Sequence, residues 1–403
     1  ATKYVKALEA LLCVHHTISA AWQIIGHRCQ VEPIVPIVSC ARLFSNLLMR
    51  PDDEIGTRSL PSYSERHAAF ASSVSEFLLN EGYRSRWVTV DFQASMSTRL
   101  LLVRGAKSFV ALHILATPKR LDEVLQPGLT CEMTNEFASR PKRPMQTRLV
   151  HLWEDQWLEH SAIVRSRILT MLGRSRRLFA RMTYAKRIDI ATSDAFLLEN
   201  HLWATCWARY KYGLFLRKPP HDIVAVATFG PKQKWRDNRL VHKMIRYCSR
   251  RGEVVIGGIS KLISAMAADT SPDEIETLID RDWGSRDGWS TVGFQPSAML
   301  SPVTFYIGPD GLRCQPGSGK NPYVRRLPEH VSAMLEKCEA GSVMTNEKEG
   351  HRLLAEHGFY PVHDAGVERL LLMLKPCSER NHTVVLTESA SAAPRRVPTE
   401  RKK

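Results

Sequence analysis

The chain has 403 residues with 56 Lys and Arg against 41 Asp and Glu, a formal net charge of +15 at pH 7. Its 44% hydrophobic and 24% charged residues are typical of a globular protein, which excludes wholesale disorder, collagen-like rods and coiled coils. The length predicts two or three domains. The excess of cations favours a polyanionic partner, either nucleic acid or an anionic membrane surface.

Cysteines and apolar runs narrow the class of protein further. The nine cysteines are scattered without a C-x-x-C pair, which argues against zinc ribbons and thioredoxin-type sites and favours reduced thiols inside a cell. No apolar stretch reaches the roughly 18–20 residues of a membrane span. Only two acids occur in the first 51 residues, a composition that resembles an organelle-targeting segment. A basic helical extension is the alternative.

In chain order, the first elements follow from hydrophobic spacing. Apolar residues at steps of three and four predict a helix over 64–81, which ends where Gly82 follows. Short β-rich runs separated by polar or glycine breaks predict strands at 87–92, 98–103, 109–115 and 147–153. Residues 126–148 have no clear period and are expected to be irregular before that last strand, and a helix is expected to run to about residue 172.

A second alternation of elements is expected from residue 188 to about residue 374. The predicted strands lie near 212–216, 223–229, 254–257, 277–279 and 303–307. The predicted helices cover 195–208, 238–250, 260–268 and 328–337. The segment after residue 377 is rich in Ser, Ala, Pro and Arg, so we expect a disordered basic tail.

Basic residues gather in two blocks with a run of mixed rings and cations between them. From His160 to Arg187 the chain carries eight basic residues and no acid, and between Gly230 and Gly252 the only acid is Asp237. Rings and cations alternate between the two blocks, at Trp203, Trp207, Arg209, Tyr210, Lys211, Tyr212 and Arg217. Such surfaces follow a phosphate backbone and stack unpaired bases, whereas the alternative is a solvated face beside core aromatics. The residues expected to contact nucleic acid are Arg165, Arg167, Arg174, Arg176, Arg177, Arg181, Lys186, Arg187, Lys232, Lys234, Arg236, Arg239, Lys243 and Lys261.

A series of motifs begins with Trp153-Glu-Asp-Gln-Trp157, directly after an expected strand. It resembles the end of the nuclease domain in very-short-patch-repair-like endonucleases of the phage-type homing class. Further motifs similar to that family follow in its order, at Ala180-Arg181, Lys186-Arg187-Ile188, Phe196-Leu-Leu-Glu-Asn-His-Leu202, Gly213-Leu-Phe215, Val226-Ala-Thr-Phe-Gly230, Ile245-Arg-Tyr-Cys248, Val255-Ile-Gly-Gly-Ile-Ser-Lys-Leu262, Asp280-Arg-Asp-Trp283 and Val292-Gly-Phe294. The resemblance covers about residues 150–376.

The resemblance implies a restriction-endonuclease-like domain. The alternating strands and helices that follow it indicate a mixed-sheet, acetyltransferase-like domain, so the expected fold class is mixed α/β (α+β). The expected segments are a helical and extended N-terminal extension (1–62), a degenerate nuclease-like domain (63–160), a basic helical connector (161–190), a C-terminal mixed α/β domain (191–376) and a basic disordered tail (377–403).

The nuclease half departs from the family pattern. Metal-dependent nucleases of this kind need two or more carboxylates on adjacent core strands. Asp91 can stand for the first acid, but the strand expected over 109–115 carries His113 and lacks the family's Glu and Asn-Gly. Glu154 and Asp155 remain, either as metal ligands or as acids at the start of a helix. The sequence therefore favours a decayed site without a metal; an active one would use Asp91, His113, Glu154 and Asp155 with Mg²⁺.

The leading hypothesis is a non-catalytic RNA-binding component or assembly factor of a mitochondrial ribonucleoprotein such as the mitochondrial ribosome, derived from a homing-endonuclease-like protein. Its expected partners are structured RNA such as ribosomal RNA and the other proteins of the particle. One alternative is an active metal-dependent DNA or RNA endonuclease. Another is an acyltransferase in the C-terminal half, although no acetyl-CoA loop of the Q/R-x-x-G-x-G/A type occurs.

Overall fold

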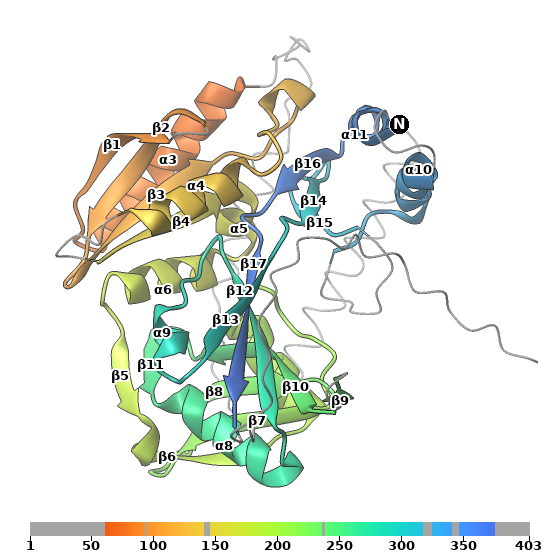
Figure 1. Cartoon of the computed structure of the whole chain (residues 1–403). Coiled ribbons are helices and arrows are strands. Elements are labelled where there is room, and N and C mark those ends of the chain that lie inside the picture. The colour runs from red at the N-terminus through yellow and green to blue at the C-terminus, as the bar shows by residue number, and fades with distance from the viewer. Residues whose placement is uncertain are drawn as a thin grey trace, which may run out of the picture. The chain divides into compact units, whose positions relative to one another are not determined.

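The computed structural model describes residues 61–92, 95–140, 146–235, 238–316, 325–340 and 346–374. The N-terminal extension up to residue 60 and the tail expected from residue 377 lie outside these residues. Within them, helices and strands alternate in several sheets, which confirms the expected mixed α/β fold class (Figure 1). No helix in this part of the chain is long and apolar enough to cross a membrane.

The first sheet has the strand order β1-β2-β3-β4, antiparallel except for the parallel pair β3 and β4. Its elements are α3 (Tyr63–Asn80), β1 (Ser85–Phe92), β2 (Ser95–Arg104), β3 (Ser108–Leu115), η1 (Leu121–Glu123), α4 (Leu129–Ser139) and β4 (Gln146–Trp153). The expected helix and strands are confirmed. Helix α3 begins with a capping box between Ser62 and Glu65, which satisfies two of the free backbone N–H groups at its start.

Helix α4 occupies part of the segment that the sequence predicts to be irregular, so that prediction is wrong. Strands β3 and β4 are parallel along their whole length, and a parallel pair requires a crossover of a dozen or more residues, usually a helix. Leu129, Met133 and Phe137 recur at steps of four and pack against the face of the sheet opposite α3. Helices therefore cover both faces of this sheet.

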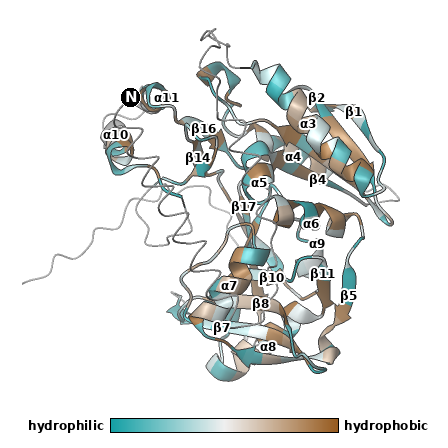
Figure 2. Ribbon diagram, turned by 180° about the vertical axis from the view of Figure 1, so that it is seen from behind, coloured by the Kyte–Doolittle hydropathy of each residue, from teal (hydrophilic) through white to brown (hydrophobic). Residues whose placement is uncertain are grey.

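A short block links the first sheet to the second. It contains α5 (Glu154–Glu159), α6 (Ser161–Met171), β5 (Arg176–Phe179), η2 (Ala180–Met182) and β6 (Thr183–Arg187). The segment 161–190, expected to be a helical connector, is helical in α6 and then turns to short extended strands. Helix α6 buries Ile163, Val164 and Ile168 in the same core as α3. Strand β5 pairs in parallel with β11 (Glu253–Ile256) and has a hydrophilic and a hydrophobic half (Figure 2).

The second sheet has the order β13-β17-β12-β10-β8-β7-β6, with β9 paired to β10. Its further elements are α7 (Ile190–Asn200), β7 (Tyr210–Leu216), β8 (Ile223–Phe229), β9 (Gln233–Lys234), β10 (Leu240–Ser249), α8 (Gly258–Thr270), β12 (Glu274–Asp280), α9 (Asp287–Ser290), β13 (Gln295–Leu300) and β17 (Val367–Met373). Strands β10 and β12 are parallel, and α8 lies in the crossover between them.

Strand β10 replaces the helix that the sequence predicts over 238–250. Lys243, Arg246 and Arg250 recur at helical steps, which produces the false helical pattern. In the structure β10 lies in the middle of the sheet, where β8 and β12 pair with its backbone. Val241 and Met244 are buried. Pairing by distant segments, which local spacing does not report, therefore decides the conformation.

A third, small sheet has the order β15-β14-β16 and lies beside α10 and α11. Its bounds are β14 (Thr304–Ile307), β15 (Arg313–Cys314), β16 (Tyr360–His363), α10 (Glu329–Ala340) and α11 (Asn346–Glu356). Leu115 and Trp153, at the ends of β3 and β4, pack with Phe305 and Val362 of this sheet. The small sheet is thus joined to the first sheet by apolar contacts.

The motif Asp280-Arg-Asp-Trp283 ties the first and second sheets together. Trp283 lies in the core of the first sheet, and its Nε1 donates to Gln156 Oε1 at 2.9 Å. The backbone N–H of His151 donates to the carbonyl of Asp282 at 3.0 Å, and Arg281 Nη2 donates to Asn135 Oδ1 at 2.6 Å. This motif therefore has a structural role.

Candidate nucleic-acid interface

Asp91, the first of the expected metal-binding acids, lies exposed on the edge strand β1. Its carboxylate accepts a hydrogen bond from Ser97 Oγ, and Arg140 Nη2 donates to its backbone carbonyl at 2.6 Å. Among the described residues none of its hydrogen bonds involves another acid. Asp91 is therefore placed apart from the acids at the end of β4.

Glu154 and Asp155 begin α5 directly after β4. Glu154 accepts hydrogen bonds from the backbone N–H and the hydroxyl of Thr117, each at 2.9 Å. Asp155 is 1% exposed and accepts two hydrogen bonds from Arg313, at 3.0 Å from Nε and 3.3 Å from Nη2. Both carboxylates bind segments that are distant in the sequence, so both have structural partners.

His113 faces His151 of the neighbouring strand, with 2.9 Å between their Nδ1 atoms. His151 Nε2 lies 2.8 Å from Thr134 Oγ1. Burial, and to a smaller extent the nearby His67, lowers the pKa of His113 to about 4, and burial likewise holds the pKa of His151 well below its ordinary value. Both rings are therefore neutral at pH 7 and link β3, β4 and α4 inside the core.

The four expected catalytic residues thus have separate sets of partners and are not brought into one site. Where side chains are described, no three or more His, Cys, Asp or Glu residues are placed to hold a metal ion together.

A group of buried acids around Arg313 is absent from the sequence-based candidates. Asp282 is 2% exposed, and burial together with Asp280 and Asp364 raises its pKa well above the ordinary value. Its carboxylate accepts a hydrogen bond from the backbone of Ala365 at 2.8 Å. Asp280 and Asp282 come from one segment and Asp364 from another that only the folded chain brings next to it, which is why sequence reasoning missed the group.

Four of the expected nucleic-acid contacts form one extended cationic segment, the β5–β6 cations, consisting of Arg177, Arg181, Lys186 and Arg187. All four are exposed, and none forms an ion pair with any carboxylate in the described part of the chain. The Arg181 guanidinium lies 4.6 Å from the ring of Phe179, and that of Arg187 lies 5.2 Å from the ring of Tyr210. Their charge is therefore presented to solvent beside aromatic surface.

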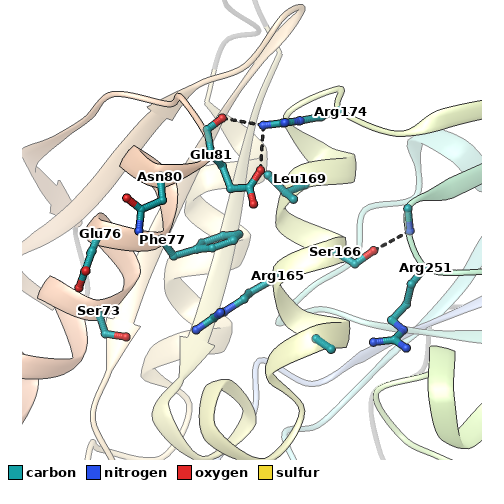
Figure 3. A pocket seen from close by; sticks show the side chains of 12 residues that line it. Ser73, Glu76, Phe77, Asn80, Glu81, Arg165, Ser166, Leu169, Arg174 and Arg251 are labelled. Atoms are coloured by element: carbon teal, nitrogen blue, oxygen red, sulfur yellow. Dashed lines mark hydrogen bonds and ion pairs between the residues drawn. The ribbon is translucent and has the colours of Figure 1, made fainter. Parts of the chain in front are cut away.

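Three further cations of the expected set lie near a cavity of about 630 Å³ between α3, α6 and the turn before β11. Figure 3 shows Arg165 and Arg174 among its lining side chains. Arg165 packs over Trp157 at 4.8 Å, Arg174 pairs with Glu81 at 2.8 Å, and Arg176, just outside the cavity, pairs with Glu253 at 3.4 Å. Each of these three side chains therefore already has a partner within the protein, either an aromatic ring or a carboxylate.

Four cations that the sequence predicts to contact nucleic acid instead bind groups within the protein, so these four predictions are corrected. Arg167 packs 4.9 Å over the ring of Trp283, and burial lowers its pKa. Lys261 donates to the carbonyls of Ala180 and Thr183. Ion pairs with acids of β12 engage the other two, Arg239 with Glu274 and Lys243 with Glu276.

Three expected nucleic-acid contacts remain, Lys232, Lys234 and Arg236. Lys232 and Lys234 are exposed at β9, where they remain available for contact. Arg236 lies outside the described residues.

A hollow of about 310 Å³, the Trp207 hollow, lies beside the β5–β6 cations. It is lined by Arg187, Ile188, Asp189, Ile190, Trp207, Ala208, Arg209 and Lys211. Trp207 is 73% exposed, the largest exposed fraction among the large apolar side chains of the described residues. The alternation of rings and cations was the sequence signal for this region, but it could not separate Trp207 from the inward-facing Trp203.

Another basic group was missed at the β1–β2 hairpin. Arg84, Arg86, Arg104 and Lys107 are all exposed there. The register that pairs Ser85 with Val103 brings the first three cations to one end of the hairpin. Strand pairing was the missing information, since these residues are spread along the sequence.

The comparisons with known proteins do not assign a family. No family model matches the chain, and no curated protein matches it. Among solved structures, a chain from a crystal structure of the NatC complex bound to Gag peptide and CoA is 12% identical, with 48% of this chain and 99% of that chain covered. The TM-score of 0.23 is too low for that match to bear on fold or function.

Proposed function

We propose that this protein is a non-catalytic RNA-binding component of a ribonucleoprotein, derived from an endonuclease of the very-short-patch-repair-like homing class. The observation that carries the proposal is the β5–β6 cations, which are exposed and have no ion pairs among the described residues. A cation without a carboxylate partner contributes its full charge to a phosphate and releases the condensed counterion there.

The nearby aromatic rings favour RNA over a general polyanion. Phe179 is 40% exposed next to Arg181, and Trp207 is 73% exposed near Arg187. Single-stranded and looped RNA offers unstacked bases that can stack on such rings, whereas the bases of a duplex are already stacked on one another. RNA with loops and bulges is therefore the proposed ligand.

The acids of the first sheet support a binding role. The carboxylates of Glu154 and Asp155 accept hydrogen bonds from Thr117 and Arg313, and Asp91 lies on a separate edge strand. A divalent metal in a nuclease needs several carboxylates that converge on one point. The resemblance to a nuclease is therefore proposed to reflect ancestry.

The proposed setting is a mitochondrial ribonucleoprotein, such as the mitochondrial ribosome or one of its assembly intermediates. It rests on the scarcity of acids in the first 51 residues and on the basic segment after residue 377. The tagged full-length protein should enter mitochondria and cosediment with ribosomal RNA in a sucrose gradient. Cosedimentation that survives nuclease treatment of the RNA would contradict the RNA contact.

The central test is charge reversal at Arg177→Glu with Arg181→Glu in the full-length protein. We expect binding to a structured RNA with single-stranded loops to weaken by tenfold or more at moderate salt, because two phosphate contacts become repulsive. A matched control is Arg120→Glu with Arg352→Glu, which changes the net charge equally at two exposed arginines paired to Asp122 and Glu349. Equal loss in both variants would contradict a specific role for β5 and η2.

A nuclease assay separates the proposal from its main alternative. The purified protein with Mg²⁺ or Mn²⁺ should leave DNA and RNA intact. Cleavage that disappears in Asp91→Ala would overturn the non-catalytic role.

A further inference from the structure

Two tryptophans in one loop point in opposite directions. Trp203 and Trp207 both lie between α7 and β7. Trp203 Nε1 donates to Asp280 Oδ2 at 2.9 Å, and its ring stacks on Phe305 with 5.5 Å between centroids. Trp207 is 73% exposed. One indole therefore anchors the loop, and the other is displayed by it.

The displayed indole is held on a fixed support. Its neighbours in the sequence are tied inward: Cys206 Sγ lies 3.3 Å from Thr228 Oγ1, and Ala208 is 6% exposed. Lys211 Nζ donates to the carbonyl of Ala208 at 2.6 Å. An exposed aromatic ring on an ordered support loses little conformational freedom when a flat partner packs on it.

The surroundings of Trp207 are cationic. Arg187 and Arg209 line the same hollow, are exposed, and have no ion pair within the described residues. The acid of the lining, Asp189, accepts a hydrogen bond from the backbone N–H of Thr192 at 2.7 Å and keeps its negative charge. Arg187, Arg209 and Lys211 outnumber it, so the lining carries a net positive charge. The hollow therefore combines a flat apolar surface with two available guanidinium groups.

We infer that the Trp207 hollow binds one unpaired nucleotide of an RNA, with the base stacked on Trp207 and the adjoining phosphate held by Arg187 and Arg209. The volume of about 310 Å³ is suited to one small flat group, since it lies at the lower end of the roughly 300–1,000 Å³ of small-molecule sites. Stacking on an aromatic ring tolerates any base, and guanidinium groups bind phosphate oxygens with two parallel hydrogen bonds.

This inference rests on the proposed RNA binding and adds the class of nucleotide that it recognises. Arg187 belongs both to the β5–β6 cations and to the hollow. An RNA strand that contacts Arg187 therefore lies next to the hollow. The hollow selects a base that is free to leave its stack, and the remaining β5–β6 cations contact phosphates of any sequence.

The experiment compares Trp207→Ala and Trp207→Phe in the full-length protein, with a single-stranded oligouridine and an RNA duplex of equal length as probes. We expect Trp207→Ala to weaken binding of the oligouridine by about 5- to 150-fold, the range that follows from the loss of one stacked base. Binding of the duplex should change by less than about twofold, and Trp207→Phe should retain most of the affinity. The matched control is Leu158→Ala, which truncates an exposed apolar side chain elsewhere in the protein, on α5, and should change the binding of neither probe.

Photocrosslinking gives a second readout. Oligouridine that carries 5-iodouracil should crosslink to the peptide containing Trp207 in the wild-type protein and should lose this crosslink in Trp207→Ala. Unchanged oligouridine affinity in Trp207→Ala, or an equal loss for the duplex, would overturn the inference. If Arg177→Glu with Arg181→Glu weakens both probes at the same time, the proposed function survives that failure. If the wild-type protein binds neither probe, the proposed function fails and the inference fails with it.

Discussion

The first sheet and the β5–β6 segment differ in whether their charged and polar side chains have partners within the protein. In and beside the first sheet, Asp155 is buried against Arg313, Glu154 accepts two hydrogen bonds from Thr117, and His113 is neutral in the core. Along β5 and β6 the cations are exposed without ion pairs in the described residues. Glu154, Asp155 and His113 therefore hold parts of the protein together, whereas the β5–β6 cations remain available to a partner.

The largest expected effect is the loss of stability when the buried ion pair between Arg313 and Asp155 is broken. Replacement of Arg313 by Met leaves Asp155 buried without its partner and removes the positive charge beside Asp280 and Asp282. We expect a loss of about 3–5 kcal/mol in the free energy of unfolding, measured by urea denaturation. Asp155→Leu combined with Arg313→Met should recover much of that loss. A stable single variant would mean that the pair is not structural.

The next effect is on the pH dependence of stability. The pKa of His113 is about 4 in the folded protein and about 6.5 when unfolded, so between these values the unfolded chain binds more protons. Stability is therefore complete above pH 6.5 and decreases on acidification toward pH 4, by up to about 3 kcal/mol for this group. His113→Gln should flatten that slope in denaturation curves recorded across this range. An unchanged slope would place the acid sensitivity elsewhere.

A smaller effect tests the exposed cations. Arg177→Ala with Arg181→Ala should reduce the steepness of log Kobs against log salt by about 1.4, since each lost phosphate contact on single-stranded RNA accounts for about 0.7. Binding titrations at several salt concentrations measure the slope. The same slope in variant and wild type would show that these arginines do not touch phosphate.

The smallest effect is expected at paired surface cations. Arg174→Ala with Arg176→Ala removes the ion pairs of two exposed arginines with Glu81 and Glu253, and we expect each loss to cost about 1 kcal/mol of stability. The salt slope should fall less than in the variant at Arg177 and Arg181, because Arg174 and Arg176 already have carboxylate partners. A larger fall would remove the distinction between paired and unpaired cations.

Local periodicity predicted the parts of the fold that depend on local contacts. Helix α3 and the three strands after it were predicted because their apolar spacing and breaks lie within short windows. Strand β10 was predicted as a helix because its partners β8 and β12 are distant in the sequence. Helix α4 was missed because the need for a crossover follows from the parallel pair β3 and β4.

The sequence predicted which types of residue form the candidate site, but it did not predict which of them are exposed and which are bound within the protein. The sequence identified the arginines of 165–187, but it could not show that Arg167 packs on Trp283 while Arg181 is exposed. It identified the run from Trp203 to Arg217 without separating Trp203, which binds Asp280, from Trp207. Ion pairs such as Arg313 with Asp155 join residues far apart in the chain, so they appear only after folding.

The position of β17 has a consequence for biosynthesis. This strand lies between β12 and β13, and β13 has no other partner in the described sheet. β16, a few residues earlier, completes the contact of the small sheet with Leu115 and Trp153. During translation, the edges of β12 and β13 that pair with β17 therefore remain unpaired until β17 is synthesised, which for β13 is about seventy residues later. A chain interrupted before residue 367 lacks the strand that joins β12 to β13, so incomplete products expose strand edges that are prone to aggregate.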